Sequence, residues 1–181
     1  MHLKEFFKKY IANTPEKAII VERKMFLGYL TKAVMEGLEF ENSNKNVFIT
    51  SRCLKHLFDK KPAEEFLFLL DHLHEIVKFP DRIYKNLAGK RGDFCFVKKI
   101  KNEEYFCTLE FLESCGSGCE SVDLQPVQMS IGQKIEIQIA TAFRLRDKKY
   151  TKNYTLLWDW GNGNPHRSVL DTHKESTNAP Q

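Results

Sequence analysis

Apolar residues recur with a helical period in the first half of the chain, and this pattern predicts helices there. The most regular series lies between positions 66 and 77, and its members are Phe66, Leu69, Leu70, Leu73, Ile76 and Val77. A spacing of about 3.6 residues is that of one buried helix face. This helix is expected to stop at Phe79, because the residue before a proline disfavours helical backbone.

A shorter amphipathic helix is predicted over residues 1–12. Asn13 and Pro15 then form a helix-start signal, in which a capping side chain is followed by a proline near the first turn. Apolar residues recur with rough helical spacing from there to about Gly37, although residues 19–21 could equally form a strand.

The polar residues 41–46 predict a loop, and the apolar residues 47–50 after it predict a short strand. Ser51 would then cap a helix over residues 52–58. A strand is therefore expected to lead directly into the helices of this region.

Beyond Pro80 the period of the apolar pattern changes to two, which is the period of strands. Strand candidates rich in β-branched and aromatic residues are residues 83–86, 93–100, 104–113, 135–144 and 154–158. Residues 89–92 and 101–103 are expected turns, and residues 115–131 are a longer insertion with Gly and Ser. The order predicts an α+β fold, with N-terminal helices followed by an antiparallel sheet of about four to five strands.

The 181 residues are enough for one domain with a buried core, and an apolar fraction of 42% supports a packed globule. We expect an N-terminal helical extension over residues 1–45, a main domain over residues 46–160 and a tail over residues 161–181. The sequence shows no secretory signal pattern and no apolar run of membrane-spanning length. The five cysteines form no even framework, so reduced thiols in a cytoplasmic protein are the simplest interpretation.

Positive charge is concentrated in two blocks, although the formal net charge is only +4. Residues 78–101 hold eight Lys/Arg against two Asp, and residues 144–152 hold five against one Asp. Such a distribution suggests one basic face for a polyanionic partner. Two solvated, lysine-rich turns would give the same counts.

Arg52 and His56 form the first candidate site. They stand four residues apart on a short predicted helix that follows a strand, so their side chains can share one face. Histidine is the usual proton-transfer residue near neutral pH, and a guanidinium beside it can bind a phosphate oxygen. The alternative is that His56 only caps or packs against the longer helix.

Three further residues are candidates for contacts with phosphate. Lys90 and Arg91 lie on a glycine-flanked turn before a strand, where two cations can project with little obstruction, although an ordinary basic hairpin would look the same. Thr141 continues an alternating apolar row that starts at Ile135. Its hydroxyl would donate to a phosphate near the strand end, or the residue is simply a good strand former.

Cations and aromatic residues interleave after this strand. The candidate RNA-binding residues are Arg144, Arg146, Lys149, Lys152, Tyr154 and Trp158, with Tyr150 and Trp160 nearby. Aromatic rings beside cations suit bases stacked along a phosphate track. For the tryptophans, the alternative is the hydrophobic side of a final strand.

No metal or cofactor site is expected. Cys115 and Cys119 have a spacing that zinc could use, but no second Cys/His pair follows at a suitable distance. His72 and His74 lie two residues apart on a helix and therefore point to different sides. No glycine pattern matches a dinucleotide-binding or Walker loop.

Three stretches carry a family resemblance: residues 49–56 (ITSRCLKH), the long helix that ends at a Pro80–Asp81 step, and residues 139–143 (IATAF). Together they resemble the phage-type nucleases of the barnase–EndoU–colicin–RelE superfamily, over roughly residues 45–160. The resemblance implies helices before an antiparallel sheet of about four strands, which would make residues 46–160 the nuclease domain. It also implies metal-independent RNA cleavage, often in toxin, phage or conflict systems.

By this resemblance, the arginine and histidine of the superfamily's early helix fall on Arg52 and His56. Its later basic position falls near Lys90 or Arg91, and its hydroxyl falls on Thr141. We expect His56 to serve in acid–base chemistry, the cations to stabilise charge and Thr141 to orient phosphate. RNA is the expected partner, and a protein inhibitor or immunity partner is a further candidate.

Two alternatives stand beside the ribonuclease hypothesis. A non-catalytic binding module on the same fold would hold RNA or a protein through its basic, aromatic face, with salt-sensitive RNA binding and no product. A protein-binding accessory domain of phage or mobile-element origin would show no RNA affinity at moderate salt.

Overall fold

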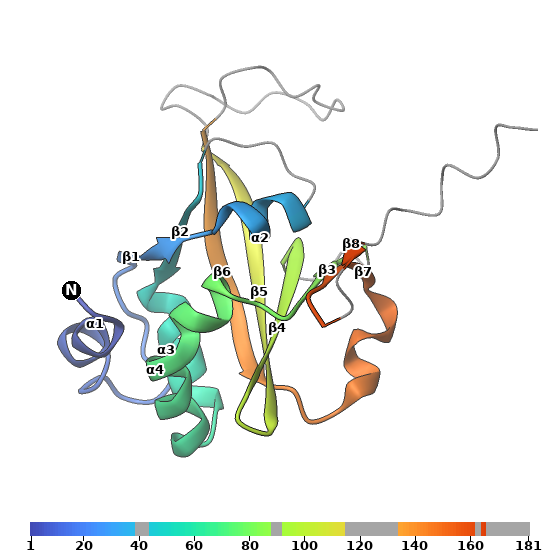
Figure 1. The fold of residues 1–181 in the computed structure, drawn as a ribbon. Coiled ribbons are helices and arrows are strands. Elements are labelled where there is room, and N and C mark those ends of the chain that lie inside the picture. The colour runs from blue at the N-terminus through green and yellow to red at the C-terminus, as the bar shows by residue number, and fades with distance from the viewer. Residues whose placement is uncertain (39–43, 88–91, 115–133, 162–163, 166–181) are drawn as a thin grey trace, which may run out of the picture.

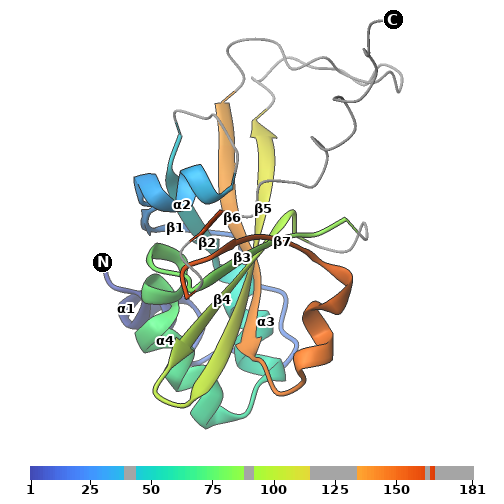
Figure 2. The same cartoon turned by 45° about the vertical axis from the view of Figure 1, so that its right-hand side comes forward.

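A mixed β-sheet runs through the molecule, with helices packed against it (Figure 1, Figure 2). The computed structural model describes residues 1–38, 44–87, 92–114, 134–161 and 164–165. The helices are α1 (Leu3–Tyr10), α2 (Lys32–Gly37), α3 (Ser51–Lys60) and α4 (Ala63–Lys78), with a 3-10 helix η1 (Lys148–Asn153). The strands are β1 (Lys24–Tyr29), β2 (Asn46–Thr50), β3 (Arg82–Lys85), β4 (Phe94–Ile100), β5 (Glu103–Ser114), β6 (Lys134–Arg144), β7 (Thr155–Asp159) and β8 (Asn164–Pro165).

The strand order in the sheet is β1-β2-β6-β5-β4-β3-β7-β8, and β8 adds only two residues. Neighbouring strands are antiparallel, with the exception of β2 and β6, which pair in parallel. The protein is therefore an α+β protein with a mixed, mostly antiparallel open sheet. The expected number of four to five antiparallel strands is too low, because β1 and β2 of the N-terminal half also join the sheet.

Apolar clusters fill both faces of the sheet. In β4, Phe94 and Phe96 point into the larger cluster, which also takes residues from all four α-helices, whereas Cys95 and Val97 point into a smaller cluster on the other side. We call these sides the helix face and the η1 face, because Tyr150 of η1 packs on the smaller cluster. None of the helices in the described ranges is long and apolar enough to cross a membrane.

The strongly periodic segments have the structure that their patterns predict. α4 covers the predicted long helix and ends before Phe79, its C-cap residue. The five strand candidates match β3, β4, β5, β6 and β7 to within one residue at each end. Lys101 and Asn102 form the turn between β4 and β5. Lys101 adopts a positive φ of 57° in this turn. The proposed insertion at residues 115–131 lies outside the described residues.

The prediction of helical structure between residues 13 and 37 is wrong for most of this segment. β1 occupies its middle, only α2 is helical, and residues 19–21 belong to no helix or strand. In β1, Met25 is buried while Phe26 is 44% exposed, as expected for a strand with one covered face. Leu27 is an extra residue that forms a bulge and interrupts this alternation. Without strict alternation, the apolar positions of this segment resembled a helical pattern.

The N-cap of α3 is Thr50 and not Ser51 as predicted. The Thr50 hydroxyl accepts a hydrogen bond from the backbone N–H of Cys53 at 3.0 Å. The fully buried Ser51 instead binds the preceding coil: its Oγ accepts from the N–H of Arg23 at 2.9 Å and donates to the carbonyl of Val21 at 3.0 Å. Two adjacent hydroxyl residues carry the same capping signal, and only this tertiary contact distinguishes them.

Candidate nucleic-acid interface

Arg52 and His56 share the exposed side of α3, in agreement with their spacing. Leu54 and Leu57 on the opposite side are buried in the helix-face cluster, which sets the rotation of α3. Arg52 forms a 3.4 Å ion pair with Glu22, and both side chains stay largely exposed. A phosphate can compete for this guanidinium, because an exposed ion pair contributes only about 1 kcal/mol or less.

α3 lies beside the part of β6 that β2 does not pair. β2 pairs with β6 at only two positions, Ile137 and Gln138. The backbone N–H and C=O groups of β6 beyond Gln138 therefore need other hydrogen-bond partners on this side. The Sγ of Cys53 lies 3.6 Å from the carbonyl oxygen of Ala140. Cys53 belongs to the helical turn that carries Arg52 and His56. Ala140 directly precedes Thr141, so the two predicted segments of the site are in contact.

A β-bulge turns Thr141 to the η1 face of the sheet. Thr141 pairs with Thr108 of β5, and the next pair skips Ala140, which is the extra residue. Ile139 and Ala142 both belong to the helix-face cluster. Thr141 therefore does not continue the row of Ile139, and the strict alternation expected for this strand is wrong. No hydrogen bond joins Thr141 to the described side chains of α3.

Thr108, the cross-strand neighbour of Thr141, was not a predicted site residue. It is buried, and its hydroxyl has no hydrogen-bond partner among the residues that the structure describes. Gly92 packs directly on it, since a Cβ at Gly92 would lie 2.7 Å from the Thr108 Cβ. An unbonded buried hydroxyl disfavours the folded state unless a partner reaches it, which makes this pair of threonines a polar spot within an apolar face.

Lys90 and Arg91 lie outside the described residues. Described residues on the two sides of this segment are in contact, because the Asn86 side chain donates to the Gly92 carbonyl at 2.7 Å. Gly92, which follows Arg91 in the chain, packs on Thr108 and therefore lies beside the pair of threonines.

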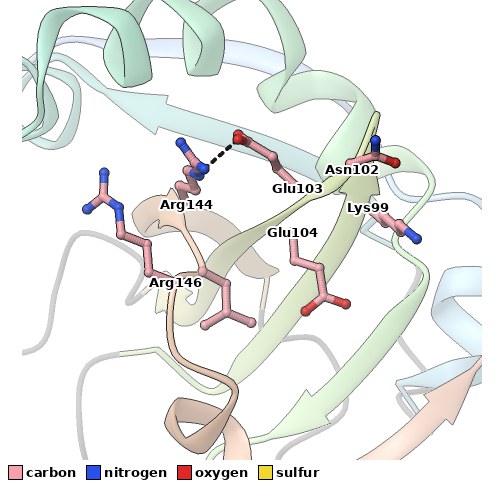
Figure 3. A pocket seen from close by; sticks show the side chains of 7 residues that line it. Lys99, Asn102, Glu103, Glu104, Arg144 and Arg146 are labelled. Atoms are coloured by element: carbon pink, nitrogen blue, oxygen red, sulfur yellow. Dashed lines mark ion pairs between the residues drawn. The ribbon is translucent and has the colours of Figure 1, made fainter.

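A pocket of about 370 Å³ opens where the β4–β5 turn meets the end of β6 (Figure 3). It is lined by Lys99, Asn102, Glu103, Glu104, Arg144, Leu145 and Arg146. Arg144 forms an ion pair with Glu103. The buried Glu65 of α4 accepts hydrogen bonds from the Arg144 backbone at 3.0 Å and from the Arg146 guanidinium at 2.6 Å. Two predicted RNA-binding cations are thereby held at one pocket.

Lys61 adds a cation that the sequence did not single out. Its Nζ lies 4.8 Å from the centroid of the Phe143 ring, which packs on the η1 face. Burial lowers the pKa of Lys61, and the charge of Arg146 acts in the same direction while Glu65 opposes it. Lys61 follows α3 directly, and only the packing of α3 against β6 brings it to this surface.

An exposed aromatic ring stands next to these cations. Tyr150 is 47% exposed, and its ring lies 5.1 Å from that of Phe143 at an interplanar angle of 78°. Lys149 and Lys152 of η1 are also exposed. Tyr154 is half-buried below them, where burial raises the pKa of its hydroxyl to about 12, so it stays protonated.

Trp158 lies apart from the other predicted RNA-binding residues. It packs against the helix-face cluster, and its ring is 3.2 Å from the position that a Cβ at Gly37 of α2 would take. Trp160 is 37% exposed, and its ring lies 4.9 Å from that of Trp158. The core interpretation therefore describes Trp158 better than the RNA-stacking one.

The remaining predicted chemistry concerns metals. Cys115 and Cys119 lie outside the described residues, and within those residues no three His, Cys, Asp or Glu side chains are grouped as metal ligands. Comparison with protein-family models, with curated proteins and with solved structures finds no match to this chain.

Proposed function

We propose that this protein is a metal-independent ribonuclease whose reacting groups lie where α3 meets β6. The observation that carries the proposal is the contact between Cys53 and Ala140. It joins the turn of α3 that bears Arg52 and His56 to the segment of β6 that bears Thr141. The exposed position of the first two residues leaves them accessible to a large substrate.

The order of elements gives a second support. α3 and α4 precede the antiparallel strands β3 to β6, as the resemblance to the barnase–EndoU–colicin–RelE superfamily implies. The same resemblance suggests a role in a phage, toxin or conflict system, with a protein inhibitor or immunity partner. In this proposal the β2-to-β7 part of the chain is the nuclease unit.

In the proposed reaction, a ribose 2′-hydroxyl attacks the neighbouring phosphodiester. His56 takes up the proton of that hydroxyl and returns it to the departing 5′-oxygen. The bond from phosphorus to the 5′-oxygen breaks, which leaves a 2′,3′-cyclic phosphate and a 5′-hydroxyl. Arg52, Thr141 and the Lys90–Arg91 segment hydrogen-bond the phosphate oxygens and stabilise the added negative charge.

The η1 face gives the RNA a path from Thr141 toward the end of β6. Phe143, with Lys61 over its ring, and the exposed Tyr150 lie along this path. An unpaired base can stack on an exposed ring while nearby cations contact the phosphates. Single-stranded RNA is therefore the proposed substrate.

Incubation of the purified protein with mixed cellular RNA in EDTA tests this function. The parent is expected to produce fragments with cyclic-phosphate ends. His56→Ala and Arg52→Ala should each lose about a hundredfold or more in rate, because each removes a group that acts on the reacting phosphate. Circular dichroism should show an unchanged fold, since both side chains are exposed.

His74→Ala is the matched control, because it removes an exposed histidine from α4. It should cleave RNA at the parent rate. If His56→Ala and Arg52→Ala also cleave at that rate, the assignment of the reacting groups is wrong.

A non-catalytic RNA-binding module is the second candidate, and the collection of Lys61, Arg144 and Arg146 at one end of the sheet favours it. Such a module would bind RNA without product, and its affinity would fall steeply with salt. Arg146→Ala would weaken that binding, whereas His56→Ala would leave it unchanged.

A further inference from the structure

The pocket at the end of the sheet offers a ligand both positive and negative groups. Its charged lining residues are Lys99, Glu103, Glu104, Arg144 and Arg146. Partners outside the pocket fix several of them. Arg82 forms an ion pair with Glu104 and also donates to the Tyr84 hydroxyl at 3.2 Å, while Glu65 holds Arg146. The charges are thus positioned before a ligand arrives, which lowers the entropic cost of binding.

Some of the hydrogen-bonding groups of the lining residues already bind other residues of the protein. Glu103 pairs with Arg144 and accepts a hydrogen bond from the Tyr105 hydroxyl at 2.9 Å. Glu104 contacts Arg82 through Oε1. These bonds fix the orientation of the lining side chains.

Other groups of the lining stay available to a ligand. The Nζ of Lys99, the Asn102 amide and the Oε2 of Glu104 have no hydrogen-bond or ion-pair partner among the described residues. Arg146 contacts Glu65 through only one guanidinium nitrogen. Lys99 and Arg146 lie on opposite sides of the pocket (Figure 3). An anionic group can therefore bind to either cation while Glu104 accepts from an N–H group.

A nucleotide combines these two features, because it carries a phosphate and a base with N–H donors. The volume of about 370 Å³ lies within the usual range of ligand sites, roughly 300–1,000 Å³. Cytosine, adenine and guanine have an exocyclic amino group that a carboxylate can accept from. Uracil has a carbonyl oxygen in place of the amino group of cytosine, and its N3–H donor is flanked by two carbonyl oxygens that repel a carboxylate.

The pocket also lies close to the proposed reaction site. Arg144 follows Thr141 by three residues in β6, which corresponds to about 10 Å along a strand. Phe143, which Lys61 and Tyr150 contact, lies between Thr141 and Arg144 in this strand and shares the η1 face with Thr141, whereas Arg144 pairs with Tyr105 of the helix-face cluster. A single strand of RNA at Thr141 would therefore reach the pocket with a nearby nucleotide.

We propose that this pocket is a subsite that binds one unpaired nucleotide of the RNA substrate. Its phosphate contacts Lys99, and the amino group of its base donates to Glu104. The subsite prefers bases with an exocyclic amino group over uracil. This inference rests on the ribonuclease function proposed above, and it adds the residues that select the substrate beside the cleavage site.

Titration calorimetry of the full chain with cytidine and uridine 5′-monophosphate tests the subsite without requiring cleavage. Cytidine monophosphate should bind more tightly than uridine monophosphate. Lys99→Ala should weaken both about tenfold, since it removes one charge-assisted hydrogen bond. Glu104→Gln should reduce the difference between the two nucleotides. Lys32→Ala, an exposed lysine of α2, is the control and should leave both affinities unchanged.

Cleavage kinetics separate this inference from the function on which it rests. In an active ribonuclease, Lys99→Ala should raise KM with kcat unchanged. Active cleavage with an unaltered KM and no binding of either mononucleotide would overturn the subsite and leave the ribonuclease function intact. Mononucleotide binding that is lost in Lys99→Ala, in a protein that cleaves no RNA, would support the pocket and overturn the ribonuclease function.

Discussion

Lys55 and Asp59 form an ion pair one helical turn apart on α3, and their side chains are only 5% and 9% exposed. Burial by itself would raise the pKa of Asp59. Hydrogen bonds from Lys55 and from the Lys17 backbone, together with the charges of Lys55 and His56, outweigh burial and lower the pKa of this carboxyl. Asp59 is therefore ionised at neutral pH, and its hydrogen bond from the Lys17 backbone ties α3 to the coil that follows α1.

We predict that this ion pair makes stability depend on pH in the acid range. The folded pKa of Asp59 lies below its ordinary value of 3.8, so the stabilisation is complete above that value and is lost as pH falls through the folded pKa. Asp59→Asn should lower the free energy of unfolding by about 3 kcal/mol at neutral pH, because Lys55 stays buried without a counter-charge. It should also flatten the loss of stability below about pH 4.

Urea unfolding at neutral and acid pH measures both effects. Asp71→Asn is the control, because Asp71 pairs with Lys4 at the exposed surface. It should cost less than about 1 kcal/mol at neutral pH. Equal losses in the two variants would show that the buried position of Asp59 does not matter.

At the scale of elements, the junction of β2 and α3 depends on two neighbouring hydroxyls with different contacts. Thr50→Ala removes a helix cap and should lower the free energy of unfolding by about 1 kcal/mol. Ser51→Ala should cost more, about 2 kcal/mol, because it breaks the hydrogen bonds to both Arg23 and Val21. Denaturant unfolding of the two variants ranks them, and a smaller loss in Ser51→Ala would contradict the observed cap assignment.

The same elements show which parts of the fold the sequence predicts. α4 and the strands from β3 to β7 were predicted because each keeps one period over most of its length. β1 was missed and Thr141 was assigned to the wrong face, and both errors come from bulges, at Leu27 and Ala140. A bulge depends on the partner strand, so a pattern read along one segment does not contain it.

The candidate site follows the same rule. The shared face of Arg52 and His56 depends on helix geometry alone, and the spacing was enough to predict it. Lys61 and Thr108 could not be found in this way, because each reaches the surface of β6 from another element. Residues adjacent on one element are thus predictable, and residues that meet across elements need the topology.

At the scale of the whole molecule, both halves of the chain share the helix-face cluster. Phe6 of α1 is 1% exposed in this cluster, and Trp158 of β7 packs against the same cluster from the other end of the sheet. The N-terminal half also supplies β2, which pairs in parallel with β6. Because such contacts are distant in sequence, the halves are expected to unfold together.

We therefore predict one cooperative transition that a change in α1 shifts as a whole. Phe6→Ala should lower the free energy of unfolding by about 3–5 kcal/mol, since it opens a cavity at a fully packed ring. The midpoints from circular dichroism and from tryptophan fluorescence should fall together. Ile19→Ala, at a side chain that is 97% exposed, should leave both unchanged. If Phe6→Ala moves the dichroism midpoint but not the fluorescence midpoint, α1 belongs to a separately folding extension and the shared core does not couple the halves.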